Sequence, residues 1–306
     1  MKWWGVVFLL LSTQSFAQTG MSLGMRGGAS LRCQETSKSS WLPQGNNLIA
    51  AYHFNGSGTV LNGATIPNDV AGGPTATASV ASSTLTYNAH AALPSTLAYL
   101  RNYLSTTGAS NDIISSSGFA NLTAGTWNFW VNMALPTGTA QRLFYKSNNG
   151  TTAGYYLTID TSNTLKFQKV YSLTNASVQT CPLATSFANT WRMITITWDG
   201  TLTSTAIKIY MNGFELVTTG TGSVFLASPG SCTGASSNGG YSAVTTGLGT
   251  SGDDSAYPFY LTGQAVNTAT TPTSTAFVGS MDEFSVWDKA LTAAEIALLY
   301  RNQKCN

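Results

Sequence analysis

Four of the twelve acidic residues in this 306-residue sequence lie in one short segment. The segment GSMDEFSVWDKALTAAEIALLYRN, residues 279–302, contains Asp282, Glu283, Asp288 and Glu295. Carboxylates this close together could form a catalytic pair, bind a metal ion or serve the architecture of the fold. The spacing of the acids helps to separate these three roles.

The spacing does not indicate a catalytic carboxylate pair. Glycosidases place two carboxylates on either side of the scissile bond, and two acids on one face of a strand must be two residues apart. Asp282 and Glu283 are adjacent, so a regular strand would point them to opposite faces. Asp253 and Asp254 lie among Gly and Ser residues, which favours a solvated turn. We therefore expect no enzyme activity.

The two histidines indicate no catalytic site either. His53 lies inside an expected strand and His90 lies in polar sequence, and no G-x-S-x-G motif accompanies them. Lone histidines of this kind are more often structural or solvated than catalytic. No two cysteines have the C-x₂₋₄-C spacing of a zinc site.

The four cysteines predict two disulfides if the protein is exported. An even number of cysteines in an oxidising compartment is first interpreted as a disulfide framework, and four cysteines allow three connectivities. We favour Cys33–Cys305, because the ends of a closed domain usually lie close together. This choice leaves Cys181–Cys232, with both cysteines in sequence rich in Ser, Thr and Gly.

The first residues of the chain predict export. Residues 1–17, MKWWGVVFLLLSTQSFA, combine Lys2, a short apolar run and a small-x-small ending, as a cleaved signal peptide does. Residues 18–46 lack periodicity and are expected to be a loosely ordered lead-in. No later segment has about 20 consecutive apolar residues, so no insertion into a membrane is expected. The localisation predicted is secreted or cell-surface, in a bacterium.

The composition excludes partners that require a concentrated positive charge. Charged residues make up 8% of the chain, and the formal net charge is +2. No cluster of Lys and Arg is present, so nucleic acid and anionic membranes are not expected partners. Ser, Thr, Asn and Gly replace charges, which is typical of extracellular β-proteins.

The hydrophobic pattern predicts mostly strands. Short alternating or apolar runs are separated by turn-forming residues, which is typical of half-buried antiparallel sheets. The expected strands span residues 48–54, 126–133, 154–160, 164–171, 191–198 and 206–213. Within the last of these, Ile207, Ile209 and Met211 should share one face, with Lys208 and Tyr210 on the other.

One helix is expected, after residue 292. Thr292 and Glu295 match a capping box, in which each side chain binds the backbone amide of the other residue. Ile296, Leu299 and Tyr300 then lie on one face, so the helix should pack against a sheet. Glu295 is thereby assigned to architecture, and we assign Asp288 to the turn Trp287-Asp288-Lys289.

About 260 strand-rich residues with one terminal helix predict a single β-sandwich over residues 47–306. Residues 223–276 are unusually poor in periodicity, and we expect them to form a long loop excursion. Sugars stack on aromatic rings, so Tyr241, Tyr257 and Tyr260 in this excursion are the candidate ligand-binding residues. The strand tryptophans are better assigned to the core.

Several motifs resemble one known family. In order they are LIAAYHFNGSG, NDVAGG, AGTWNFWVNMALP, NTWRMITITWDG, IKIYMNGFELV and GSMDEFSVWDKALTAAEIALLY. Their order over residues 47–302 resembles the LamG-like jelly-roll family of the concanavalin A-like lectin/glucanase superfamily, and residues 223–276 match it poorly. The resemblance implies an all-β, two-sheet antiparallel jelly roll with its first and last strands adjacent, which agrees with the Cys33–Cys305 pairing.

The resemblance also implies a structural calcium ion. In relatives the ligands include an acid of the final strand and an acid of an early loop, here Asp282 and Asp69. The sequence reads Phe54-Asn55-Gly56 where many relatives have Phe-Asp-Gly, so one carboxylate is replaced by an amide. Calcium accepts amide and backbone oxygens at weaker affinity.

We therefore expect a secreted, non-catalytic module that binds glycans or a glycosylated surface and serves adhesion. The alternative is a structural or protein-contact module of a surface assembly. A polysaccharide-cleaving enzyme is the third and least supported interpretation.

Overall fold

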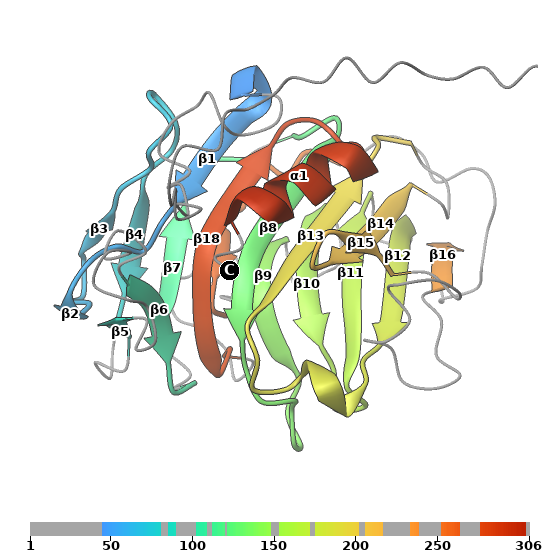
Figure 1. Ribbon diagram of the computed structural model, residues 1–306. Helices are drawn as coiled ribbons and strands as arrows, with labels where there is room; N and C mark the ends of the chain where they lie inside the picture. Colours follow the sequence, from blue (N-terminus) through green and yellow to red (C-terminus); the bar gives the residue numbers. More distant parts are fainter. Residues whose placement is uncertain are drawn as a thin grey trace, which may run out of the picture. The chain divides into compact units, whose positions relative to one another are not determined.

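Two antiparallel sheets pack face to face in the computed structural model of the chain (Figure 1). The structure describes residues 45–80, 85–89, 102–108, 112–119, 121–147, 153–171, 175–201, 206–216, 233–238, 252–263 and 276–303. The prediction of an all-β jelly-roll sandwich with one short helix is confirmed.

Sheet 1 contains the first and the last described strands. Within the described residues it has the order β15-β14-β13-β8-β18-β6-β5-β2, with β1 paired to β18. The bounds are β1 (Leu48–Tyr52), β2 (Gly58–Thr59), β5 (Thr86–Ala89), β6 (Asn102–Thr106), β8 (Gly125–Asn132), β13 (Arg192–Trp198), β14 (Ile207–Met211), β15 (Phe214–Glu215) and β18 (Gly279–Trp287). The expected pairing of first and last strands is present.

Sheet 2 has the order β16-β12-β11-β10-β9-β17-β7-β4-β3 within the described residues. Its strands are β3 (Thr65–Ile66), β4 (Ala76–Ser79), β7 (Ile113–Ser116), β9 (Gln141–Ser147), β10 (Gly154–Ile159), β11 (Thr164–Val170), β12 (Asn175–Pro182), β16 (Thr233–Asn238) and β17 (Phe259–Leu261). Every pair of neighbouring strands described in the two sheets is antiparallel.

Aromatic side chains from both sheets fill the space between them. Trp127 and Phe129 of β8 meet Phe144 of β9, Tyr155 of β10 and Phe167 of β11, and all five are completely buried. The Trp127 ring centroid lies 4.6 Å from that of Tyr155 and 5.1 Å from that of Phe167. Tilted and edge-on contacts of this kind add to the hydrophobic stabilisation of a core.

Helix α1 (Ala293–Gln303) covers the outer face of sheet 1 (Figure 1). The capping box is confirmed, because Thr292 N donates to Glu295 Oε2 at 2.7 Å and Glu295 N donates to Thr292 Oγ1 at 3.3 Å. Ile296 and Leu299 are completely buried against the sheet. Two 3₁₀ turns, η1 (Gly45–Asn47) and η3 (Thr185–Phe187), complete the described helical elements. None of the described helices is long and apolar enough to cross a membrane.

The six predicted strands correspond to β1, β8, β10, β11, β13 and β14, within a few residues at each end. The predicted faces of β14 are also correct. Ile207, Ile209 and Met211 belong to the core between the sheets, whereas Tyr210 packs on the helix side and Lys208 is exposed.

Part of the predicted loop excursion, residues 223–276, is not a loop. It supplies β16 at one edge of sheet 2 and β17 between β9 and β7. β17 has three residues and β16 reads TGASSN, so neither has the alternating apolar pattern by which strands are predicted.

Candidate functional site

A cavity of about 600 Å³ lies beside the end of β1. Loop and strand residues from His53 to Tyr87 form its walls, and the cavity is half open to solvent. Its lining combines apolar and polar side chains: His53, Phe54, Asn55, Gly56, Thr59, Val60, Leu61, Ala64, Thr65, Ile66, Pro67, Asp69 and Tyr87. This size and mixture suit a small-molecule or glycan site.

His53 is held between two carboxylates at the wall of the cavity. His53 Nε2 lies 2.9 Å from Asp69 Oδ2, and His53 Nδ1 lies 2.9 Å from Glu283 Oε2. The side chains of His53 and Glu283 are 6% and 12% exposed, whereas that of Asp69 is 38% exposed. Asp69 therefore connects the buried histidine with the cavity.

The two carboxylates keep His53 protonated. Burial opposes the charged form, but the attraction of Glu283 and the hydrogen bonds to Asp69 and Glu283 outweigh it, and the pKa of His53 rises to about 10. At neutral pH both ring nitrogens of the imidazolium donate. One positive and two negative charges then give the cluster a net charge of −1.

A bulge in the last strand aims Glu283 at His53. β1 and β18 are antiparallel and pair Tyr52 with Phe284. The residue after Tyr52, His53, therefore lies opposite the residue before Phe284, which is Glu283. The pairing of β18 with β8 is irregular between Asp282 and Ser285, and Glu283 has φ 52°. A bulge reorients a side chain that a regular strand would point elsewhere. Asp282 and Glu283 therefore lie in irregular backbone. The expectation that they point to opposite faces was based on a regular strand.

Backbone strain occurs on both sides of this contact. Phe54, the residue after His53, has φ 51° and is buried. Bulky residues rarely adopt the left-handed region, and such strain is concentrated at functional sites. The strained backbone at Phe54 and Glu283 therefore supports a functional site at the end of β1 and the bulge of β18.

The structure brings one of the two predicted calcium ligands to the cavity. Asp69 lines it, while Asp282 is buried in β18 and its Oδ1 accepts a hydrogen bond from Glu283 N at 2.9 Å. In the part of the chain that is described, no group of three or more His, Cys, Asp or Glu residues is arranged to hold a metal ion. Calcium binding by Asp69 and Asp282 stays a prediction.

Of the three predicted ligand-binding tyrosines, two are described. Tyr260 is in β17, where it pairs with Tyr145 and is 3% exposed, so its expected position in a loop was wrong. Tyr257 lies just before β17 and is half-buried. Tyr241 lies outside the described residues. Contact of these tyrosines with a ligand stays a prediction.

The predicted disulfides fall largely outside the described residues. Cys33, Cys232 and Cys305 are not among them, and Cys181 is buried and disulfide-bonded. β12 and β16 pair Thr180 with Thr233, the neighbours of Cys181 and Cys232 in sequence. Both pairings stay predictions.

Sequence reasoning missed the contacts of His53 and the position of Tyr87 in the cavity. For Glu283, packing across the sheet or pairing with a base was expected, and Glu283 does pair with His53. His53 was interpreted as structural or solvated, although the expected contact of the first and last strands already placed it near Asp282 and Glu283. Tyr87 lies in β5, a four-residue strand without an apolar pattern. Asp288 was expected in a turn, and it directly follows the end of β18 at Trp287. Its Oδ1 accepts a hydrogen bond from Asn47 Nδ2 at 2.8 Å.

The family comparison and the structural comparison agree. Residues 102–248 match a family model described as the concanavalin A-like lectin/glucanases superfamily. No curated protein matches the sequence.

Solved binding domains of toxins share the fold. The binding domain of Paraclostridial Mosquitocidal Protein 1 superposes with a TM-score of 0.54 and 12% identity, over 83% of this chain and 52% of that chain. The botulinum neurotoxin type G receptor binding domain has a TM-score of 0.51 and 14% identity, over 84% and 51%. The botulinum neurotoxin serotype D ligand binding domain in complex with N-acetylneuraminic acid has a TM-score of 0.52 and 12% identity, over 84% and 51%.

This chain spans about half the length of these solved chains, and the low identities show a likeness of fold alone. The sequence match over residues 102–248 and the shared fold together confirm that this chain resembles the concanavalin A-like lectin/glucanase superfamily.

Proposed function

We propose that the protein binds an uncharged glycan in the cavity between His53 and Tyr87, without catalysis. The observation that supports this most directly is the cavity itself, in which an accessible ring, amide, hydroxyls and carboxylate surround about 600 Å³. The fold is one that solved receptor-binding and ligand-binding domains share.

The lining offers the contacts that sugars need. The Tyr87 ring is half-buried and can stack on the apolar face of a pyranose. Asn55, Thr59 and Thr65 are exposed, and their side chains donate to and accept from hydroxyl groups. Asp69 Oδ2 is engaged by His53, which fixes the carboxylate so that its other oxygen can accept from a sugar hydroxyl.

The charge of the site favours an uncharged glycan over an anionic one. Among the described residues that line the cavity, His53 and Asp69 are the charged ones. The His53 charge is already balanced by Asp69 and Glu283, and the cluster has a net charge of −1. A sialic acid would bring a second negative charge to this wall, beside Asp69, and like charges repel.

The same lining supports binding without catalysis. Glycoside hydrolysis uses two carboxylates that flank the scissile bond. Asp69 is the single carboxylate among the described residues that line the cavity, and Glu283 lies behind His53. Export through residues 1–17, adhesion to a glycosylated surface and a structural calcium ion at Asp69 and Asp282 are parts of the proposal that rest on the sequence.

A glycan array tests the proposal directly. Residues 18–306 would be screened in calcium and in EDTA, on neutral and sialylated glycans. We expect binding to neutral glycans. Loss of that binding in EDTA would support the calcium prediction. Binding confined to sialylated glycans would overturn the assignment of the ligand class, and no binding in either buffer would favour a protein-contact module.

Variants locate the site. Titration of an array hit by calorimetry should show about tenfold weaker binding by Tyr87→Ala and by Asn55→Ala. Phe214→Ala is the matched control, because Phe214 is an exposed aromatic residue outside the cavity. Equal affinities of all four proteins would place the ligand elsewhere.

A further inference from the structure

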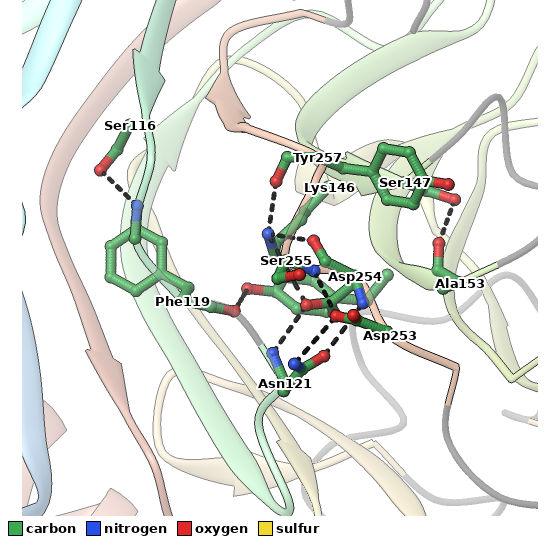
Figure 2. Close-up of polar contacts among 12 residues, drawn as sticks. Ser116, Phe119, Asn121, Lys146, Ser147, Ala153, Asp253, Asp254, Ser255 and Tyr257 are labelled. Atoms are coloured by element: carbon green, nitrogen blue, oxygen red, sulfur yellow. Dashed lines mark hydrogen bonds and ion pairs between the residues drawn. The ribbon is translucent and has the colours of Figure 1, made fainter. Parts of the chain in front are cut away.

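A second charge cluster lies in the interior and includes side chains from β9 and β11 of sheet 2. Lys146 Nζ lies 3.7 Å from Asp254 Oδ1, and Lys169 Nζ lies 3.7 Å from Asp254 Oδ2. All three side chains are completely buried. Figure 2 shows Lys146, Asp254 and the neighbouring Asn121 and Tyr257. The described residues thus place two ammonium groups around one carboxylate, and glycan binding does not require this cluster.

The register of sheet 2 places the two lysines on the inner face. Tyr155 of β10 pairs with both Lys146 of β9 and Lys169 of β11. Lys169 has the same parity as Phe167, and Lys146 the same parity as Phe144, so both point between the sheets. This end of the inner face therefore replaces apolar side chains with amines.

The segment before β17 brings Asp254 to the lysines. Asn121 fixes it reciprocally: Asn121 N donates to Asp254 Oδ1 at 2.7 Å, and Asp254 N donates to Asn121 Oδ1 at 3.0 Å (Figure 2). The expected solvated turn at Asp253 and Asp254 was therefore half wrong. Asp253 is exposed, but Asp254 is buried because partners distant in sequence surround it.

The two lysines have different surroundings. Lys146 Nζ donates to the carbonyl oxygen of Asp254 at 2.9 Å and to that of Tyr257. Lys169 Nζ has aromatic neighbours, with the ring centroids of Tyr155 and Trp198 at 5.6 Å and 5.0 Å. No hydrogen bond reaches Lys169 Nζ or Asp254 Oδ2 within the described part of the chain. Lys169 Nζ and Asp254 Oδ2, two buried atoms that lack hydrogen bonds, therefore face each other.

We propose that Lys169 and Asp254 join through an intramolecular isopeptide bond. One proton first passes from Lys169 Nζ to Asp254 Oδ2. The neutral amine then attacks Asp254 Cγ, a bond forms between nitrogen and carbon, and the bond from Cγ to Oδ2 breaks. Two of the three ammonium protons leave with Oδ2 as water. The ammonium and carboxylate thus become one amide and one water molecule, and no other reactant is consumed.

The surroundings favour this step. Burial lowers the pKa of the Lys169 amine, more than Asp254 raises it, and the nearby Lys146 lowers it further. The neutral amine that attacks is therefore easier to form than in water. Negative charge that develops on Oδ1 meets the Asn121 N–H and the Lys146 ammonium, as in an oxyanion hole. Oδ2 has no hydrogen bond to break.

The product would remove a buried ion pair and replace it with a neutral amide. It would also connect β11 covalently to the segment that precedes β17. The net charge of the cluster stays at +1, and the remaining Lys146 ammonium keeps its hydrogen bonds to the carbonyl oxygens of Asp254 and Tyr257.

Intact-mass spectrometry of the purified protein tests the bond. The sample is first reduced and alkylated, so that disulfides do not alter the mass. We expect a mass lower by one water molecule than that calculated for the alkylated sequence. A mass equal to the calculated one would overturn the proposal and leave an ion pair, and this result needs no variant that could fail to fold.

Peptide mapping locates the bond. Trypsin should leave Lys169 uncleaved and join the peptide that contains it, through Asp254, to residues 209–289. Without reduction, a Cys181–Cys232 disulfide would connect the same peptides, so comparison of reduced and unreduced digests also tests that disulfide. A crosslink at Lys146 instead of Lys169 would overturn the assignment of the nucleophile.

Two lysine substitutions on β11 form a matched pair. Lys169→Arg keeps the positive charge but removes the nucleophile, so its mass should show no loss of water. Lys166→Arg changes the same strand outside this cluster, and the loss should persist. Persistence of the loss in Lys169→Arg would exclude this bond.

Discussion

The two buried charge clusters of this fold have opposite stoichiometries. At the cavity, one imidazolium lies between two carboxylates, whereas between the sheets two ammonium groups share one carboxylate. The difference appears in the pKa values, because that of His53 is raised to about 10 and those of Lys146 and Lys169 are lowered. Burial opposes the charged form of all three side chains. The number of carboxylates nearby therefore decides whether the pKa is raised or lowered.

The clusters also differ in access. Asp69 is 38% exposed at the cavity, while Asp254 is completely buried. The excess negative charge of the His53 cluster is partly solvated through Asp69, so it can interact with a ligand. An excess positive charge without access to water has a high free energy.

Removal of Asp254 should have the largest effect on stability. Asp254→Ala leaves two buried amines without their carboxylate and also prevents the proposed bond to Lys169. Loss of one partner of a buried ion pair typically costs about 3–5 kcal/mol. Urea denaturation followed by tryptophan fluorescence measures the change. Asp253→Ala is the control, because Asp253 is exposed, and we expect it to change the midpoint little. Equal midpoints for the two variants would contradict the assigned importance of the buried cluster.

The stability contributed by His53 should depend on pH. The pKa of His53 is raised on folding, so its contribution is complete below about pH 6.5, the value of an unfolded histidine. It is lost as the pH rises towards about 10. The difference in free energy of unfolding between wild type and His53→Gln, measured from pH 6 to pH 10, should fall by an amount on the order of a few kcal/mol. A difference that stays constant would show that His53 is neutral in the folded protein.

Asp69→Asn should affect glycan binding more than stability. The substitution keeps a side-chain oxygen near His53, and Glu283 still accepts from the other ring nitrogen. Loss of the charge-assisted acceptor for a sugar hydroxyl should weaken binding about tenfold, measured by calorimetry at constant pH. The surface variant Glu215→Gln, which alters the exposed pair with Lys208, is the control. Unchanged affinity in Asp69→Asn would separate the His53 cluster from ligand binding.

Gly56→Ala should produce the smallest effect and act on the cavity alone. A methyl group at Gly56 would clash with the Tyr87 ring, which can rotate away because it is a half-buried side chain. We expect affinity to change by a few-fold and the urea midpoint to stay nearly constant. Gly63→Ala adds a methyl group in open space but at φ 78°, so it should lower stability and leave binding unchanged.

The regular parts of the fold could be predicted from the sequence. β8, β11 and β13 have seven or eight residues with strong apolar character, and Thr292 with Glu295 is a local capping signal. β2, β3, β15 and β17 have two or three residues, too few for a period of two to appear. Their positions depend on tertiary pairing.

The candidate site was only partly predictable, because burial and contact are set by partners far apart in sequence. Asp69 was identified through a family resemblance. The contact of His53 with Glu283 depends on a bulge and on strands separated by 230 residues, and neither leaves a local pattern. The burial of Asp254 likewise depends on Asn121, Lys146 and Lys169.

The position of β18 has a consequence for how the chain folds. β18 pairs with β1, β6 and β8, so a strand that is synthesised after all three of its partners lies in the middle of sheet 1. Until it emerges, β8 and β1 lack their shared neighbour and the aromatic core stays open. Contacts of such large sequence separation form slowly. We expect sheet 1 to close only after β18 has been synthesised, which gives a chaperone time to bind the unfolded chain.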